Sequence, residues 1–268
     1  MAERSMPSAF FRFGTSRSFC PKSDSALIHE KSGIELFPCM NMIVENSEFF
    51  ASAAQREVLL QLLDHPAIES DFFLTGGTAL AVFYLRHRLS DDLDFFSIGH
   101  PDLPRIDFWI RTQWPGNCSK IKMSQQFLSY LIQETRVDFV IDPLSNQKER
   151  GSVSFENGRK LFVDNMENIV SNKLGAMVGR QEPKDFVDFY FLMNDFPDIQ
   201  LDDVYKNARL KDAIFDDPPT AAFQLEEGLA LFRENPFLLP EMKRPFPMAD
   251  FLVFFEKIAA WIYQKIRK

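Results

Sequence analysis

The chain has 268 residues, of which 46% are hydrophobic and 25% are charged, a balance that supports one or two folded domains with a buried core. Its net charge of −8 argues against broad, sequence-independent binding of nucleic acid, because that mode needs a basic face. No apolar run is long enough to span a bilayer, and the three cysteines form no CxxC pair. We therefore expect a cytoplasmic protein with reduced thiols and no membrane partner.

Residues 1–45 have weak periodicity and scattered Ser, Pro and Gly, which predicts an irregular N-terminal extension. We expect residues 1–39 to be dispensable for folding, with a start at Met40 or Met42 giving the same fold.

Two regions with different patterns follow the extension. Residues 46–163 are predicted to form an α/β core, and residues 164–268 a helical C-terminal domain in which prolines separate the helices and Asp164 caps the first one. The predicted fold class is α+β, with a mixed sheet, flanking helices and a C-terminal helical region. Helices are expected at 48–63, 78–88 and 102–114, and strands at 71–76, 92–97, 118–127, 128–135 and 136–142, with a hairpin over 152–163 that turns at Asn157-Gly158.

A glycine pair, Gly76 and Gly77, stands between a predicted strand and a predicted helix. Glycine permits a sharp turn and a close approach of a ligand, and the free amides at a helix start favour an anion such as phosphate. Thr78 adds a hydroxyl there, and Ser90 is expected to shape the turn before the next strand. A glycine pair alone is more often only a tight turn, so the phosphate-binding interpretation depends on the residues that follow.

Asp92 and Asp94 are two residues apart on a predicted strand and therefore share a face, while Leu93 and Phe95 point to the core. Adjacent carboxylates repel each other unless a cation lies between them, and a divalent ion with oxygen ligands fits that role. Asp138 lies in another apolar strand and completes a metal site if the two strands pair. The alternatives are a solvated acidic turn for the pair and an outward-facing residue for Asp138.

The strings LTGGTALAVFYLRHRLSDDLDFFS and NKLGAMVGRQEPKDFVDFYFL together resemble the AbiEii/AbiGii toxin family of nucleotidyltransferases, within the DNA polymerase β-like superfamily. That family carries a GGTAL-type loop, an HR-x-S-x-D-x-D-type segment, a later strand aspartate and a helical Lys…Arg…Asp…Asp signature. Lys173, Arg180, Asp185 and Asp188 match the signature, and the resemblance covers about residues 55–195.

The resemblance implies that the mixed sheet of the α+β fold is of the nucleotidyltransferase type. It also implies an enzyme that transfers a nucleoside monophosphate from a nucleoside triphosphate to an acceptor hydroxyl. It implies Mg²⁺, or Mn²⁺ in its place, as cofactor, and a toxin of a toxin–antitoxin or abortive-infection system with a cognate antitoxin and an acceptor such as tRNA. The implied catalytic residues are Asp92, Asp94 and Asp138, which are also the metal ligands, together with Lys173. The implied nucleotide-binding residues are Gly76, Gly77, Thr78, Ser90, Lys173, Arg180, Asp185 and Asp188.

The second signature also has a physical interpretation. Lys173 and Arg180 are about two helical turns apart and share a helix face that can lean over a triphosphate. Asp185 and Asp188 follow Pro183, which is expected to begin the next helix, and they orient the two cations or bind a second substrate. The alternative is a surface set of salt bridges between two helices.

The sequence leaves the acceptor and the nucleoside triphosphate undetermined. We expect His87 to make structural hydrogen bonds and Arg88 to face the substrate. Two other functions stay open: a nucleotidyltransferase that modifies a small molecule or a protein, which the acidic balance favours over an RNA acceptor, and a non-catalytic interaction protein that keeps the fold. The intact acids and Lys173 argue against the second.

Overall fold

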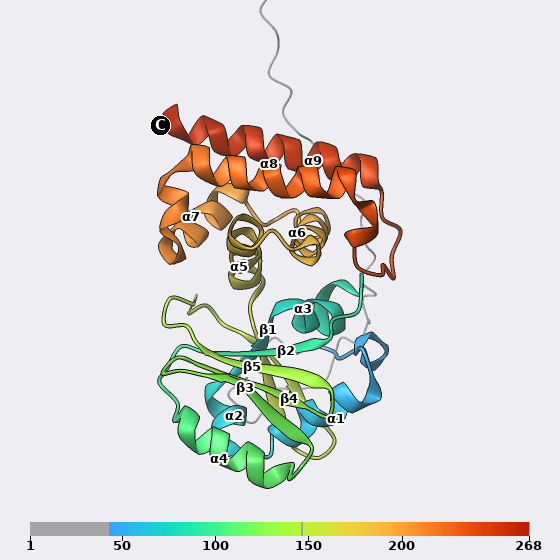
Figure 1. Cartoon of the computed structure of the whole chain (residues 1–268), viewed down its shortest axis with the longest axis vertical. Helices are drawn as coiled ribbons and strands as arrows, with labels where there is room; N and C mark the ends of the chain where they lie inside the picture. Colours follow the sequence, from blue (N-terminus) through green and yellow to red (C-terminus); the bar gives the residue numbers. More distant parts are fainter. Residues whose placement is uncertain (1–42, 146, 268) are drawn as a thin grey trace, which may run out of the picture. The chain divides into compact units, whose positions relative to one another are not determined.

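The computed structural model describes residues 43–145 and 147–267 (Figure 1). Most of the predicted extension, including the alternative starts at Met40 and Met42, lies outside the described residues. The expectation that residues 1–39 are dispensable therefore stays a prediction.

The described residues form a seven-stranded mixed sheet in the order β3-β4-β5-β2-β1-β7-β6. Strands β2 and β5 pair in parallel, as do β1 and β7, and the other neighbours are antiparallel. The predicted α+β class with a mixed sheet is confirmed. The strands are β1 (Phe73–Thr75), β2 (Asp92–Ser97), β3 (Cys118–Met123), β4 (Phe127–Ile132), β5 (Thr135–Ile141), β6 (Gly151–Ser154) and β7 (Lys160–Val163).

Helices cover both faces of the sheet. Figure 1 shows α1, α2 and α4 along one face, and α3 with the later helices on the other. Helix α3 continues directly as a π-helix, Leu80–Leu85, which ends at Arg86 in the left-handed conformation with φ 54°. The α-helices are α1 (Ala53–Leu62), α2 (Pro66–Asp71), α3 (Gly76–Ala79), α4 (Leu103–Gln113), α5 (Met166–Gly179), α6 (Pro183–Asp195), α7 (Leu201–Lys211), α8 (Pro218–Glu234) and α9 (Met248–Tyr263).

Many of the 29 phenylalanines lie in the hydrophobic core. In the sheet, the rings of Phe95 and Phe139 stack at 5.4 Å between centroids. Among the later helices, Phe186 packs against Phe232 at 4.7 Å and against Phe255 at 5.1 Å, both edge to face. Such aromatic pairs bury large apolar areas with a defined geometry, so they fix how the helices pack against one another.

The start of α5 corrects one prediction. Asn165, and not Asp164, is the N-cap, because the Asn165 side chain accepts from the amide of Asn168. The carboxylate of Asp164 is fully buried and is held instead by Thr75, whose hydroxyl donates to it at 2.8 Å, and by Arg150 at 3.2 Å. Pro183 begins α6 as predicted, since proline at the first position of a helix loses no internal hydrogen bond.

Candidate functional site

The turn between β1 and α3 needs glycine at both positions. Gly76 has φ +70°, and a Cβ atom there would lie 2.2 Å from Asp94 Oδ2. A Cβ atom on Gly77 would lie 2.4 Å from Ser90 Oγ and 2.8 Å from Arg88 Nη2. Real Cβ atoms do not come so close to other heavy atoms, so Gly76 brings the backbone against the Asp94 carboxylate of β2, and Gly77 brings it against Ser90 and Arg88.

Thr78 and Ser90 fix the geometry of this turn. The Thr78 hydroxyl is fully buried and donates to the carbonyl oxygens of Ser90, at 3.2 Å, and Asp92, at 2.5 Å. The Ser90 carbonyl also accepts from Gln55 Nε2 at 2.8 Å. These bonds tie the start of the helix to the start of β2, and the Thr78 hydroxyl faces those carbonyls.

The three predicted acids lie on one face of two paired strands. On β2, Leu93 and Phe95 are fully buried while Asp92 and Asp94 occupy the alternate, partly exposed positions, as the alternation predicts. Strand β5 runs parallel beside β2 with Asp94 and Asp138 as direct partners. The strand pairing on which the third acid depended is therefore confirmed.

The carboxylate of Asp138 already has partners. Ser129 Oγ donates to Asp138 Oδ1 at 2.5 Å, and Arg136 Nη2 lies 3.0 Å from Oδ2. Across residues 43–145 and 147–267, no group of three or more His, Cys, Asp or Glu side chains is arranged to hold a metal ion. The guanidinium of Arg136 thus compensates the negative charge of Asp138.

Asp94 carries excess negative charge in its surroundings. Burial and the neighbouring carboxylate of Asp92, with a smaller effect from Asp138, raise the pKa of Asp94 to about 6, although Lys173 and Arg180 oppose the shift. The pKa is raised because burial and the two neighbouring carboxylates together outweigh the attraction of these two cations. Within the described part of the chain, the one ion pair of Asp92 is with Lys184, whose ammonium lies 3.7 Å from Oδ2. Asp92 and Asp94 therefore fit a divalent cation with oxygen ligands.

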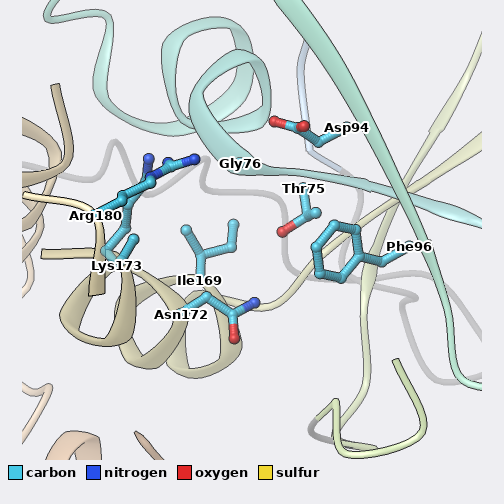
Figure 2. A pocket seen from close by; sticks show the side chains of 9 residues that line it. Thr75, Gly76, Asp94, Phe96, Ile169, Asn172, Lys173 and Arg180 are labelled. Carbon is cyan, nitrogen blue, oxygen red and sulfur yellow. The ribbon is translucent and has the colours of Figure 1, made fainter. Parts of the chain in front are cut away.

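A cavity of about 260 Å³, here called the central cavity, opens beside these acids. Figure 2 shows Asp94, Gly76 and Arg180 toward one end of it and Phe96 and Asn172 toward the other. The lining residues come from β1, β2, α5 and the adjoining turns: Thr75, Gly76, Asp94, Phe96, Ile169, Asn172, Lys173, Ala176 and Arg180.

Lys173 and Arg180 both line the central cavity, and Asp185 orients both. Lys173 Nζ lies 2.8 Å from Asp185 Oδ1, and Arg180 donates two hydrogen bonds to the same carboxylate at 2.7 and 2.9 Å. Burial alone would lower the pKa of Lys173, but Asp188 and Asp185 outweigh it and raise that pKa. Lys173 is therefore a fixed positive charge at the wall of the central cavity.

Asp188 joins Lys173 to the segment before β2. Lys173 Nζ lies 2.7 Å from Asp188 Oδ2, Arg88 donates to both oxygens at 2.6 and 2.7 Å, and His87 Nε2 lies 2.7 Å from Oδ1. Burial would raise the pKa of Asp188, but Arg88, Lys173 and the His87 hydrogen bond hold it well below its ordinary value. The salt bridges between two helices that the alternative describes are present, but Asp185 and Asp188 are fully buried, so the set does not lie on the surface.

The HR segment gives one confirmation and one correction. His87 is fully buried and hydrogen-bonded to Asp188, as expected of a structural histidine. Arg88 was expected to face the substrate, but its side chain is buried in a bidentate pair with Asp188. Paired charges are the usual way in which a buried guanidinium is tolerated.

Comparison with known proteins identifies the family. Residues 57–258 match the sequence profile of the family described as "Nucleotidyl transferase AbiEii toxin, Type IV TA system". The chain belongs to this AbiEii family. The family expected from the motifs is confirmed. In the described part of this AbiEii-family chain, no helix has both the length and the apolarity to cross a membrane.

Three individual proteins that are similar to this chain are as follows. The uncharacterized protein aq_aa25 of Aquifex aeolicus is 33% identical over 144 residues, a match that covers 52% of this chain and 65% of that protein. The crystal structure of JHP933 from Helicobacter pylori is 18% identical, with a TM-score of 0.48, over 81% of this chain and 94% of the other. MenT4, a nucleotidyltransferase toxin of Mycobacterium tuberculosis, is 14% identical, with a TM-score of 0.41, over 79% and 84% of the two chains.

Sequence reasoning missed several residues of the AbiEii-family site. Phe96 shares the strand face of Asp92 and Asp94 by the same two-residue alternation, and Arg136 shares that of Asp138, so both could have been found. Asn172 and Ile169 had no comparable signal, because their place in the wall of the cavity depends on how α5 packs against the sheet.

Proposed function

We propose that this AbiEii-family protein transfers a nucleoside monophosphate from a nucleoside triphosphate in the central cavity to an acceptor hydroxyl. The observation that carries the proposal is the arrangement of charge in that cavity. Asp94, beside Gly76, lines the same cavity as the cations Lys173 and Arg180. Cations and a tight backbone turn suit phosphates, and an undercompensated acid suits the metal that accompanies a triphosphate.

The chain's own residues would divide the work of binding. Lys173 is a point charge for the triphosphate oxygens, and Arg180, whose side chain is about half exposed at 51%, can supply a second. The amides of Gly76 and Gly77 would complete the phosphate site. Asp185 and Asp188 would act as positioning residues for the cations, and Thr78 and Ser90 as positioning residues for the turn.

Asp92 and Asp94 would hold Mg²⁺, or Mn²⁺ in its place, and Asp138 would join them as a third ligand if Arg136 releases it. When bound, such an ion supplies charge neutralisation at the leaving pyrophosphate and activation of the attacking hydroxyl. The acceptor oxygen attacks the α-phosphorus, the bond from the α-phosphorus to the oxygen that bridges it to the β-phosphorus breaks, pyrophosphate leaves, and the hydroxyl proton passes to water. Lys173 would stabilise the charge that develops on the phosphates.

We further propose that the protein works in the cytoplasm as the toxin of a type IV toxin–antitoxin pair, with tRNA as acceptor and a cognate antitoxin as partner. The family description supports the toxin role. The acceptor is the least constrained part, because the net charge of −8 offers no general attraction to RNA.

The test is incubation with each labelled nucleoside triphosphate, Mg²⁺ and either total tRNA or a nuclease-treated cell extract. Label on tRNA supports the whole proposal. Label on protein or on small molecules keeps the transfer reaction but overturns the acceptor. No label with any triphosphate and acceptor overturns the function and favours a non-catalytic protein. Asp92→Asn serves as the matched inactive control.

A further inference from the structure

The amide of Asn172 is held in one orientation by a lysine that is largely, but not fully, buried. Lys211 Nζ, from the end of α7, donates to Asn172 Oδ1 at 2.6 Å. An ammonium group can only donate hydrogen bonds, so the amide oxygen must face it. Figure 2 shows the result, with the oxygen of Asn172 turned away from the cavity and the nitrogen turned toward Phe96.

Lys211 itself has little freedom to move. Its ammonium also donates to Asn168 Oδ1 at 2.7 Å and lies 3.3 Å from Asp142 Oδ2, while its side chain is only 15% exposed. Asn168 is fixed in turn, since its Nδ2 donates to Asp164 at 2.6 Å. The chain from Asp164 through Asn168 and Lys211 to Asn172 is therefore a continuous hydrogen-bonded support behind the central cavity.

The end of the cavity at Asn172 differs chemically from the end at Asp94. Phe96 and Ile169 supply apolar faces there, and the Nδ2 group of Asn172 supplies two N–H donors. No hydrogen bond within residues 43–145 and 147–267 engages this NH₂ group. A flat ring with polar edge atoms suits such a place, because it can lie against the apolar faces and accept a hydrogen bond at its edge.

We propose that Asn172, oriented by Lys211, selects the nucleobase of the triphosphate by donating a hydrogen bond to a base carbonyl oxygen. Uracil, cytosine and guanine carry such an oxygen. Adenine has acceptor ring nitrogens, but it presents an exocyclic amine where guanine presents a carbonyl oxygen. Because Lys211 engages Oδ1, Asn172 cannot accept from that amine, so adenine offers fewer acceptors beside the Asn172 donor. This inference rests on the proposed function in placing the phosphates at the Lys173 end, but it concerns binding and is testable without transfer.

The experiment measures the affinity of the full chain for non-hydrolysable triphosphate analogues of all four bases, in the presence of Mg²⁺, by calorimetry. At least one carbonyl-bearing analogue is expected to bind about tenfold more tightly than the adenine analogue, the preference that one net hydrogen bond provides. Asn172→Asp replaces the donor by an acceptor that still pairs with Lys211. It should reduce that ratio to about one or reverse it.

Two further variants separate selection from general damage. Lys211→Met leaves Asn172 in place but frees its amide to rotate, so it should lose the discrimination while keeping the adenine affinity. Asn194→Asp makes the same chemical change on the exposed side of α6, where Nδ2 donates to Tyr190 O, and should keep the wild-type ratio. Asn172→Ser, which removes the donor without adding charge, repeats the test if Asn172→Asp fails to fold.

Each outcome decides something. An unchanged ratio in folded Asn172→Asp or Asn172→Ser overturns the inference, as does a wild-type preference for the adenine analogue. Selective binding without any transfer overturns the proposed function and leaves the base selection standing. Absence of binding by all four analogues overturns both.

Discussion

Gly76 lies directly against the Asp94 carboxylate, because a Cβ atom added to Gly76 would lie 2.2 Å from Asp94 Oδ2. The turn before α3 therefore touches the carboxylate directly, and any side chain at Gly76 would displace it. The contact involves the whole Asp94 side chain, since the added carbon would also lie 3.1 Å from its Cγ and 3.3 Å from its Cβ.

Gly76→Ala should abolish nucleotidyl transfer and destabilise the fold. The φ of +70° costs an alanine roughly 1–3 kcal/mol, and the clash with Asp94 adds to that. Gly175→Ala is the matched control, because a Cβ atom there meets nothing within 4 Å and alanine is the better helix former by about 0.5–1 kcal/mol. Melting temperature and transfer rate are measured for both. An active Gly76→Ala enzyme would show that the contact has no role.

Asp92→Asn and Asp94→Asn should each remove transfer while keeping the fold, and Asp94→Asn should raise stability at neutral pH. The folded pKa of Asp94, about 6, is above the ordinary value of 3.8, so the folded state binds the proton more tightly than the unfolded state. The wild type should therefore lose stability relative to Asp94→Asn as pH rises from about 4 through 6.

Urea unfolding of both proteins at several pH values gives this difference. A difference that is flat between pH 4 and 7 would mean that Asp94 is not electrostatically strained. Adding Mg²⁺ gives a second comparison: it should raise the melting temperature of the wild type and have little effect on either variant, since a ligand stabilises only the state that binds it.

Lys173→Ala should lose most of the transfer rate, and Lys173→Arg should keep part of it, because the charge survives with a changed geometry. Lys173 is buried with Asp185 and Asp188, so its loss costs more than a surface pair would. Breaking a buried pair costs about 3–5 kcal/mol, and the remaining arginine partners of both acids place this variant toward the lower end. Lys206→Ala, an exposed lysine on α7, should change stability by less than about 0.5 kcal/mol.

Transfer by Lys173→Ala is assayed well below its melting temperature, so that unfolding does not imitate inactivity. A folded variant with a normal rate would exclude Lys173 from the reaction and leave the aspartates as the only catalytic side chains.

Asp188→Asn should destabilise the protein by about 3–5 kcal/mol at pH 7, because it leaves Arg88 and Lys173 buried with reduced compensation. The pKa of Asp188 lies well below its ordinary value, so its stabilising contribution is present above pH 4 and is lost as pH falls through the folded pKa. This pH dependence is opposite in sign to that of Asp94. The exposed Asp198→Asn should show neither effect.

Local patterns predicted the elements well where the chain's own periodicity decides the structure. The strand over 92–97 has the predicted bounds, and the hairpin within 152–163 turns at Gly158 with φ +79°. The helix expected over 78–88 instead begins at Gly76 and adopts π geometry over Leu80–Leu85. Periodicity cannot distinguish these helical forms, because both place apolar residues on one side.

Side-chain contacts between residues far apart in the chain could not be predicted from the sequence. The Arg88 side chain meets Asp188, which lies 100 residues later, and nothing in the local pattern of either segment shows that they touch. The same reason explains why Asp164 was wrongly predicted as the helix cap, since its carboxylate accepts a hydrogen bond from Thr75, 89 residues earlier. Residue types therefore indicated the chemistry, and only the fold showed which charges compensate one another.

The carboxylate of Asp188 connects Lys173 to the segment that precedes β2, and it comes late in the chain. During translation, the acids of β2 leave the ribosome well before α6 is made. A nascent chain, or a truncated product that ends before residue 188, therefore carries the acids without the fully anchored lysine that faces them. In a chain of a toxin family, this order of synthesis postpones completion of the proposed active site until most of the protein has been made.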